Sequence, residues 1–205
     1  MSKSVEFYFD FGSPTSYLAY TQLPAICAEA GAGLVYRPVL LGGVFQATGN
    51  TSPIAIPAKG RYTMIDMLRF ARRYGVPLKM NPYFPINTLT LMRAATGVQL
   101  RQPERFEALL ACVFKGMWVD ALNLGDPAVL GPLLAEAGFD PQALLALTAE
   151  QEVKDALKAN TEAAIKRGMF GAPTMFVGSE MFFGQDRLDF VREALALRVP
   201  HPVAP

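Results

Sequence analysis

Two short stretches decide the fold of this chain: FYFDFGSP at residues 7–14 and FGAPT at residues 170–174. Apolar side chains alternate through residues 4–11, which predicts a buried strand. Ser13 then fits the N-cap of a helix and Pro14 its first turn, because a serine hydroxyl can accept from a free N–H there and proline needs no partner for a donor. The chain therefore passes from a strand directly into a helix whose N-terminus carries a hydroxyl.

The second stretch places a proline at the head of a strand. Pro173 precedes the apolar residues 174–177 and cannot donate to a ladder, so it belongs where the backbone serves another purpose. In thioredoxin-like folds a cis proline at this place exposes backbone groups to a sulfur-bearing partner, and the Ala172-Pro173 bond can be cis. Redox members of that fold carry C-x-x-C at the strand-to-helix turn, where this chain has SPTS at residues 13–16. We therefore expect a thiol-handling site that contributes no thiol, and no disulfide exchange.

Length and composition are those of an ordinary globular protein. The 205 residues are 51% hydrophobic and 18% charged, which is enough to bury a large core. With 19 basic and 18 acidic residues the formal net charge is +1, which gives no electrostatic reason to expect nucleic acid or an anionic membrane as a partner. We see neither a signal peptide nor an apolar run near the ~20 residues of a membrane span, so we expect a cytoplasmic location.

The cysteines and the single histidine limit the chemistry. Cys27 and Cys112 lie far apart within helix-like patterns, which favours two reduced, buried thiols and agrees with a cytoplasmic location. His201 is the one histidine of the sequence and stands in the C-terminal tail. A Ser-His-Asp triad would depend on that tail, and a histidine-rich metal site cannot be built. We therefore expect neither a metal nor a histidine base.

The remaining sequence predicts an α/β fold with a helical interruption. Residues 34–39 follow the first helix as a second strand and complete a right-handed β-α-β unit. Glycine, proline, asparagine and threonine crowd residues 42–60, which predicts an ordered loop that carries site residues. Near the end come strands at 174–177 and 180–183 and a helix at about 185–197. Between these parts the patterns predict helices at residues 62–74, 88–96, 103–118, 126–137, 141–147 and 149–167.

These elements together predict a thioredoxin-like sheet that is interrupted by an all-helical inserted domain. Residues 1–60 and 168–205 would form the discontinuous thioredoxin-like domain, and residues 61–167 the helical insertion domain. We find no internal repeat, heptad run or low-complexity segment that favours another architecture.

Five sequence blocks, in order along the chain, carry a family resemblance. They are FDFGSPTSY at residues 9–17, GGVFQATGN at 42–50, FPINT at 84–88, FGAPT at 170–174 and FGQDR at 183–187. Together they resemble the 2-hydroxychromene-2-carboxylate isomerases and their relatives, the kappa-class glutathione transferases. The wider family includes periplasmic disulfide oxidoreductases, from which the missing C-x-x-C separates this chain. The resemblance implies a thioredoxin-like fold, glutathione as cofactor and a homodimer.

Ser13 is the residue that this resemblance makes catalytic, as the group that holds the thiolate of glutathione. A free thiol has a pKa near ~8.5, and a hydroxyl donor together with a helix N-terminus favours its anion. Taken alone, Ser13 could be only a helix cap. The resemblance also places Ala172 and Pro173 beside the cysteinyl part of glutathione, on a cis turn that faces Ser13. Ser13 would thus stabilise a nucleophile without being one.

Four further residues are assigned to glutathione by the resemblance. Asn50 would touch glutathione near its cysteine, although it could instead bond its own backbone. Lys59 would meet the glycyl carboxylate, or it could be only a solvated charge. Gln185 and Asp186 would receive the γ-glutamyl group, whose ammonium suits a carboxylate. The alternative for Asp186 is a helix N-cap.

An aromatic substrate needs apolar walls, which a helical insert over Ser13 can provide. We assign Phe45, Asn87 and Trp118 to substrate binding. Each has a structural alternative. Asn87 could cap the helix that begins at Thr88, and the two aromatic residues could be packing residues of the core.

The resemblance implies a glutathione-dependent isomerase that interconverts 2-hydroxychromene-2-carboxylate and trans-o-hydroxybenzylidenepyruvate, a step in the degradation of naphthalene-type aromatics. The glutathione thiolate would add to the conjugated carbon of this small aromatic substrate and make a double bond rotatable. Two alternatives stay open. One is a kappa-like glutathione transferase, in which the adduct leaves as product, and the other is a glutathione-binding thioredoxin-like protein without turnover.

Overall fold

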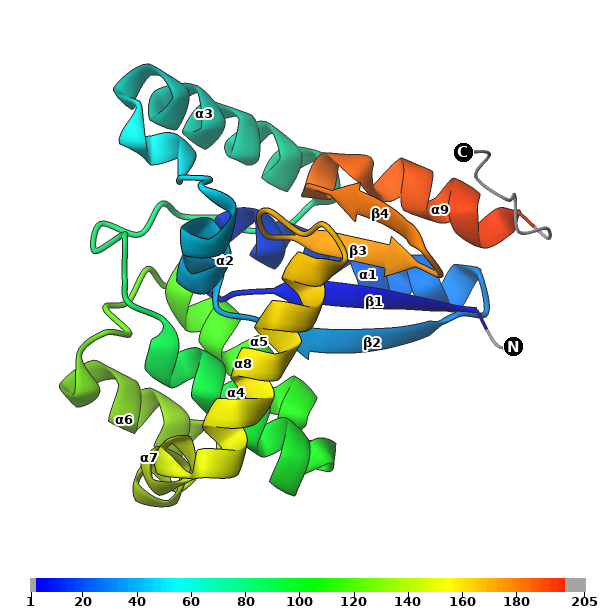
Figure 1. Ribbon diagram of the computed structural model, residues 1–205. Coiled ribbons are helices and arrows are strands. Elements are labelled where there is room, and N and C mark those ends of the chain that lie inside the picture. The colour runs from blue at the N-terminus through cyan, green and yellow to red at the C-terminus, as the bar shows by residue number, and fades with distance from the viewer. Residues whose placement is uncertain (1–2, 198–205) are drawn as a thin grey trace.

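Four strands form one mixed sheet at the centre of the protein (Figure 1). The structure is a computed structural model and describes residues 3–197. The strand order is β2-β1-β3-β4, with β1 parallel to β2 and the other two neighbouring pairs antiparallel. The strands are β1 Ser4–Phe9, β2 Gly33–Pro38, β3 Thr174–Val177 and β4 Glu180–Phe183. The predicted strands are therefore confirmed, the last two at their predicted bounds.

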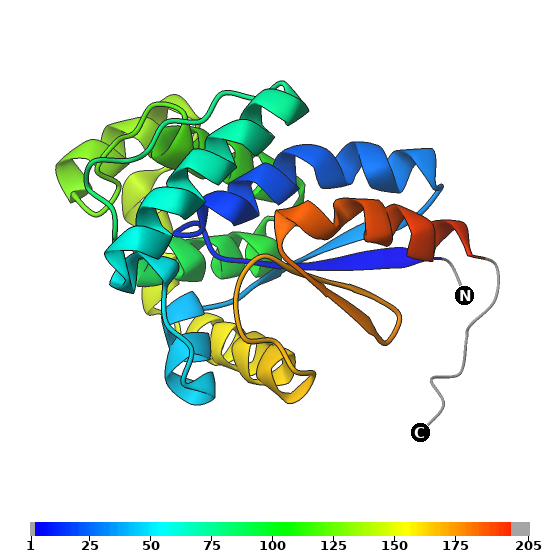
Figure 2. The same ribbon diagram turned by 90° about the horizontal axis from the view of Figure 1, so that it is seen from above.

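Helices cover both faces of this sheet. Figure 2 shows α1 and α9 on one face and α2 and α8 on the other. Helix α4 packs on the β2 edge, where the side chain of Gln99 donates to the carbonyl of Tyr36 at 2.9 Å. The helices are α1 Pro14–Glu29, α2 Leu41–Thr48, α3 Pro57–Tyr74, α4 Leu89–Arg101, α5 Phe106–Trp118, α6 Pro127–Glu136, α7 Pro141–Ala149, α8 Gln151–Lys166 and α9 Leu188–Ala196, with 3-10 turns η1 Pro53–Ala55, η2 Pro103–Arg105 and η3 Gln185–Arg187. The predicted α/β class with many helices between two parts of one sheet is confirmed.

The central strand β1 contributes to a separate core on each of its faces. Phe7 and Phe9 are fully buried in the larger core, and their rings stack with centroids 5.4 Å apart. Tyr8 points to the other face, into a smaller core, where its ring meets that of Phe176 at 5.5 Å. The predicted alternation is therefore present: one face of the strand is apolar, and the other carries Tyr8 together with the partly buried Glu6.

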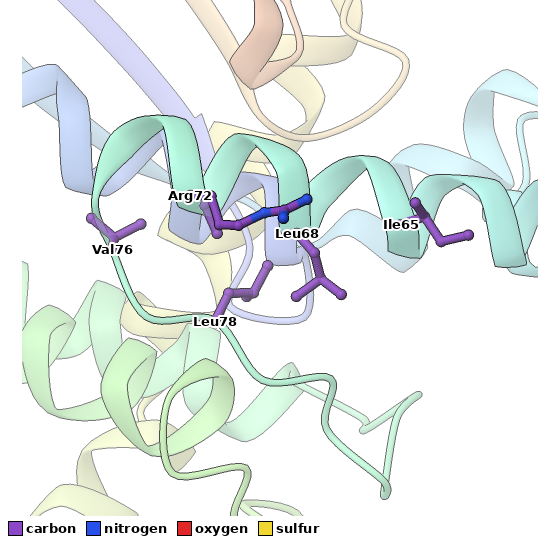
Figure 3. Close-up of a pocket in the computed structure, with 6 residues that line it drawn as sticks. Ile65, Leu68, Arg72, Val76 and Leu78 are labelled. Carbon is purple, nitrogen blue, oxygen red and sulfur yellow. The ribbon is translucent and has the colours of Figure 1, made fainter.

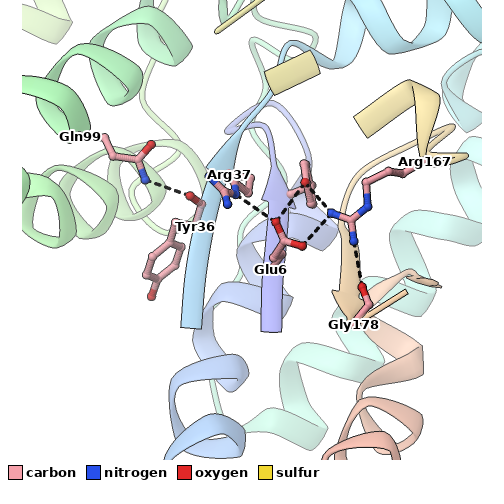
Figure 4. Close-up of polar contacts among 7 residues, drawn as sticks. Glu6, Tyr36, Arg37, Gln99, Arg167 and Gly178 are labelled. Atoms are coloured by element: carbon pink, nitrogen blue, oxygen red, sulfur yellow. Dashed lines mark hydrogen bonds and ion pairs between the residues drawn. The ribbon is translucent and has the colours of Figure 1, made fainter. Parts of the chain in front are cut away.

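A cluster of charged and polar residues lies on the α8 side of the sheet (Figure 4). It attaches the start of the segment between α8 and Pro173 to the sheet. Arg167, directly after α8, donates to Glu6 at 2.7 Å, to the Tyr8 hydroxyl at 3.0 Å and to the Gly178 carbonyl at 3.1 Å. Its guanidinium also lies 3.7 Å from the centre of the Phe176 ring. Burial alone raises the pKa of Glu6, but the hydrogen bonds and charges of the two neighbouring arginines bring it below its ordinary value. This cluster links α8, β1 and the β3–β4 hairpin.

The ordered loop predicted for residues 42–60 is wrong over most of its length. Helix α2 begins at Leu41, the turn η1 follows, and α3 begins at Pro57. The glycines of α2 suggested a loop, but Gly43 packs against Thr161 of α8, and a Cβ built on it would lie 3.6 Å from the threonine methyl. Packing against α8 therefore stabilises a helix in a segment of low helix propensity. Gly49 ends helix α2, because it takes the left-handed conformation of a C-terminal cap with φ 71°.

The bounds of α3 bear on the predicted division of the chain. This helix runs through the junction between residues 60 and 61 and packs on α1. The division into residues 1–60 with 168–205 and residues 61–167 stays a prediction. Among residues 3–197, no helix is both long enough and apolar enough to cross a membrane.

Candidate active site

Ser13 lies where β1 passes into α1 and is only 4% exposed. Its hydroxyl oxygen accepts from the backbone N–H of Ser16 at 3.1 Å, so it caps α1 as the structural alternative proposed. The same hydroxyl also lies 2.9 Å from the carbonyl oxygen of Ala172, across 159 residues of sequence. Ser13 is thus both a helix cap and the side chain that connects the start of α1 with the second stretch.

The turn that faces Ser13 is held by hydrogen bonds to its backbone carbonyls. The Ala172-Pro173 bond is cis, as the sequence predicts, and a second cis bond joins Phe84 to Pro85. The carbonyl of Pro173 accepts from the N–H of Gly184 at 3.0 Å. The hydroxyl of Thr174 donates to the carbonyl of Gly171 at 2.7 Å. These bonds fix the turn between α8 and β3 and direct the Ala172 carbonyl towards α1.

Thr15 adds a second hydroxyl to the site. Its Oγ1 lies 2.9 Å from the Oγ of Ser13 and 3.3 Å from the carbonyl oxygen of Ala172. Sequence reasoning missed this residue, because the stretch SPTS at residues 13–16 drew attention only to the cysteines that it lacks. Threonine at the second position of a helix is unremarkable by itself, so its role depends on a contact with a residue far away in the sequence.

Asp10 is a buried carboxylate next to this site, with 1% of its surface exposed. One oxygen accepts from the N–H of Gly12 at 2.8 Å and from the hydroxyl of Thr88 at 2.7 Å, and the other accepts from the N–H of Leu41 at 2.8 Å. Burial raises the pKa of Asp10, although these three donors act to lower it. Asp10 thereby joins the end of β1 to the starts of α2 and α4.

Trp118 lies in the core and not at a surface. Its ring has 0% exposure, and its indole N–H donates to the carbonyl of Phe11 at 2.8 Å. The N–H of Phe11 in turn contacts the sulfur of Met92 at 3.4 Å. The assignment of Trp118 to substrate contact is therefore corrected: it holds the backbone next to Ser13 from behind, as the packing alternative has it.

Asn50 connects the end of α2 with the turn at Pro173. Its amide donates to the carbonyl of Phe170 at 2.8 Å, and its side-chain oxygen accepts from the N–H of Thr51 at 2.8 Å. The ring of Phe170 lies 4.4 Å from that of Phe183, centre to centre, and both rings are partly exposed. The bond to its own backbone segment is therefore present, together with a contact that places Asn50 beside the site.

The other residues assigned to glutathione lie on separate elements. Gln185 is buried at the start of η3, and its backbone carbonyl accepts from the hydroxyl of Tyr74 at 2.8 Å. Asp186 is exposed and pairs with Arg187 at 2.6 Å. Lys59 is exposed in the first turn of α3. The contacts connect Asn50 with the turn at Pro173, but they do not bring Lys59 to it.

Asn87 has the capping contact of its structural alternative, and its role in substrate binding stays a prediction. Its side-chain oxygen accepts from the N–H of Leu89 at 3.0 Å at the start of α4, as a capping residue does. It also borders an open hollow of about 540 Å³. This hollow is lined by Tyr83, Pro85, Ile86, Asn87, Asn123, Gly125, Asp126 and Pro127. Phe45 is not among these residues; it is half-buried on α2.

A second hollow of about 420 Å³ lies between α3 and the segment that follows it (Figure 3). In Figure 3 the side chain of Arg72 extends along α3 towards Leu68, with Leu78 below them. Neither of these two hollows is lined by Ser13 or Ala172.

The two cysteines are free, as predicted. Burial raises the pKa of Cys27 to about 11 and also raises that of Cys112, which is only half-buried. Both thiols are therefore protonated at neutral pH and are poor nucleophiles. His201 lies outside the described residues.

The fold and the site define a thioredoxin-like protein whose redox cysteines are replaced by hydroxyls. The family described as "DSBA-like thioredoxin domain" matches residues 4–196. The chain therefore belongs to this family. The resemblance that the five sequence blocks carry lies within the same wider family.

Individual relatives make the assignment narrower. The chain is 32% identical to "2-hydroxychromene-2-carboxylate isomerase" of Sphingobium xenophagum, over 95% of this chain and 99% of that protein. It is 28% identical to human "Glutathione S-transferase kappa 1", over 100% of this chain and 96% of that protein. A solved structure of 2-hydroxychromene-2-carboxylate isomerase superimposes with a TM-score of 0.83 at 29% identity, over 94% of each chain. These relatives are enzymes that share the whole length of the fold.

Proposed function

We propose that this protein is a glutathione-dependent isomerase that interconverts 2-hydroxychromene-2-carboxylate and trans-o-hydroxybenzylidenepyruvate. The observation that carries the proposal is the Ser13 hydroxyl, which caps α1 and lies 2.9 Å from the Ala172 carbonyl of the cis turn. In the place of a redox cysteine, a hydroxyl can stabilise a thiolate but cannot form a disulfide. The name of the relatives supports the choice of substrate.

The chemistry of the residues near the cis turn fits glutathione. The hydroxyls of Ser13 and Thr15 stand at the N-terminus of α1, where an anion is favoured. We place the cysteinyl backbone of glutathione against Ala172 and the γ-glutamyl ammonium near Asp186. The ion pair of Asp186 with Arg187 is exposed and therefore weak enough to be exchanged for another cation.

Asn50, Gln185 and Lys59 would complete the glutathione site. Both polar atoms of the Asn50 amide already have one partner, which leaves its second amide hydrogen for glutathione. Gln185 is held by its backbone, so its side chain can be directed without moving η3. Lys59 is a long, exposed side chain that would meet the glycyl carboxylate.

The protein's own part in the reaction is to hold charge and exclude water. When bound, glutathione would supply a thiolate that can add reversibly to a conjugated carbon of the substrate, so that the adjacent bond can rotate before the thiolate is expelled again. With glutathione bound, Ser13 would donate its hydroxyl hydrogen to the sulfur anion, and the first turn of α1 would add its free N–H dipoles. Ser13 is nine-tenths or more buried, so this hydrogen bond would form away from bulk water.

We place the aromatic substrate in the hollow that Asn87 borders. Thr88 follows Asn87 in the chain and contacts the residues before Ser13: its hydroxyl donates to Asp10, and its methyl would lie 3.2 Å from a Cβ built on Gly12. The amide of Asn87 can bond the polar groups of the substrate, and Phe45 would offer an apolar wall on the α2 side.

A kappa-like glutathione transferase is the second candidate. The similarity to human glutathione transferase kappa over the full length of the chain favours it. Both candidates use the same thiolate, and they differ in whether glutathione leaves the adduct or remains attached to the product.

We also propose a cytoplasmic homodimer. Exposed apolar side chains in the segment from η1 through α3 support a second copy as partner, and light scattering during gel filtration tests the homodimer. They include Ile54, Ile56, Tyr62, Ile65 and Leu68.

Calorimetry with glutathione followed by a spectroscopic assay of the chromene substrate tests the proposed function. Binding and isomerisation that depends on glutathione are expected for the native protein. Binding with a stable adduct as product would favour the transferase. Glutathione binding without turnover of the substrate, or no glutathione binding, would refute the proposal of an isomerase.

A further inference from the structure

The site holds one more hydroxyl than the proposed reaction uses. The Oγ of Ser13, the Oγ1 of Thr15 and the carbonyl oxygen of Ala172 lie within 3.3 Å of one another. Ser13 has a single hydroxyl hydrogen, and its oxygen already accepts from the N–H of Ser16. The three oxygens therefore share two hydroxyl hydrogens.

Counting these hydrogens shows a conflict for Ser13. The Ala172 carbonyl belongs to a residue that is 9% exposed, and the described residues offer it only the hydroxyls of Ser13 and Thr15 as donors. If Ser13 turned its hydrogen to a thiolate and nothing replaced it, this buried carbonyl would lose its partner, which is unfavourable. Thr15 removes the conflict, because its hydroxyl can donate to the same carbonyl.

We propose that Thr15 is a positioning residue that takes over the hydrogen bond to the Ala172 carbonyl and so releases the Ser13 hydrogen for a thiolate. The inference rests on the proposed function, since it concerns how the same site holds glutathione. It assigns a role to the third residue of SPTS at residues 13–16, a place that in a C-x-x-C motif lies between the two cysteines. Thr15 acts through Ser13 and need not touch the sulfur.

The test compares Thr15→Val, which keeps the shape and removes the hydroxyl, with Thr15→Ser, which keeps the hydroxyl. Thr21→Val is the matched control: it lies on the same helix, is also half-buried and loses a hydroxyl that donates to a backbone carbonyl, that of Leu18 at 2.7 Å. The pKa of the bound glutathione thiol is measured from the ultraviolet absorbance of its thiolate, alongside the pH profile of kcat/KM.

In Thr15→Val we expect the pKa of the bound thiol and the acid limb of the profile to rise together by about one to two units, as one unpaired buried acceptor requires. The rate should recover at high pH, which a merely distorted site would not allow. Thr15→Ser and Thr21→Val should match the native protein. An unchanged thiol pKa in Thr15→Val, or the same shift in Thr21→Val, would overturn the inference.

A double-mutant cycle tests the exchange of donors without glutathione. Ser13→Ala and Thr15→Val each leave one donor for the Ala172 carbonyl, whereas the double variant leaves none. The midpoint of urea unfolding should therefore fall by more in the double variant than in the two single variants added together. If the native protein fails to bind glutathione, the proposed function fails while this cycle still decides the inference, and additive effects refute it.

Discussion

Replacing the buried Asp10 by asparagine gives a sharp test of the electrostatics beside the site. The wild-type carboxylate is 1% exposed and has three hydrogen-bond donors at 2.7–2.8 Å. Burial opposes its ionisation and the donors favour it, and because the pKa is raised, burial is the stronger effect. Asparagine never ionises, but it offers one acceptor oxygen instead of two, so at least one of the three donors loses its partner at every pH.

The pH dependence follows from the direction of this shift. A raised folded pKa means that the contribution of Asp10 is fully present below its unfolded pKa, near 3.8, and is lost as the pH rises through the folded value. Each unit of the shift corresponds to about 1.4 kcal/mol. The stability of Asp10→Asn relative to the wild type should therefore rise as the pH increases from 3.5 to 7, on top of a loss from the missing acceptor that does not depend on pH.

Urea unfolding between pH 3.5 and 8 measures this difference, with the fluorescence of the single tryptophan, Trp118, as the signal. Its indole bonds the carbonyl of Phe11, next to Asp10, so it reports on this region. Other carboxylates titrate in the same range, but they cancel in the difference between the two proteins. A variant that is less stable than the wild type at pH 7, with a gap that widens as the pH rises, would show that the three donors outweigh burial and refute the reasoning.

Three further substitutions follow from the contacts. Gly171→Ala would bring a Cβ to 2.7 Å from the ring of Phe183, so the turn or the ring must move; we expect glutathione binding to weaken by about tenfold, measured by calorimetry, and Phe183→Ala to restore it. The double variant Cys27→Ala/Cys112→Ala should retain glutathione-dependent turnover and lose about 1–3 kcal/mol of unfolding free energy through cavities. Arg167→Met should lower the unfolding free energy by about 1–2 kcal/mol in urea titrations, since it removes an ion pair and a contact with an aromatic face.

Each of these changes has a control or a contrary outcome. Gly42 has open space at its Cβ position, so Gly42→Ala should leave binding unchanged. Loss of turnover in the double cysteine variant at an unchanged melting temperature would mean that a protein thiol takes part. Arg101 has two exposed carboxylate partners, and Arg101→Met should have a smaller effect than Arg167→Met; equal effects would mean that the burial of the Arg167 cluster adds nothing.

Local signals in the sequence were enough to predict the strands and the turn. Alternation in β1, the capping pattern at Ser13 and the proline before β3 are each determined by neighbours in the chain. The segment of α2 was predicted incorrectly because its helix depends on α8, where the hydroxyl of Thr161 accepts from the N–H of Leu40 at 3.0 Å. No local pattern contains that contact.

The site shows the same limit. Asp10 could not be identified as a connecting residue, because two of its three donors come from Leu41 and Thr88, on other elements. Thr15 acquires its role from a carbonyl 157 residues away. For Trp118 the residue type alone favours packing over a pocket wall, and the contact of its indole with Phe11 next to the end of β1 confirms burial.

The most direct test of the Ser13 assignment is the ionisation of bound glutathione in the native protein and in Ser13→Ala. Titration of the ultraviolet thiolate absorbance should show a bound thiol with a pKa below the ~8.5 of the free thiol, and a value close to the free one in the variant. Turnover at neutral pH should fall by roughly 100- to 1,000-fold, as for the loss of one donor to an anion. A bound thiol with the pKa of free glutathione in the native protein, or an unchanged pKa and rate in Ser13→Ala, would contradict the role of Ser13.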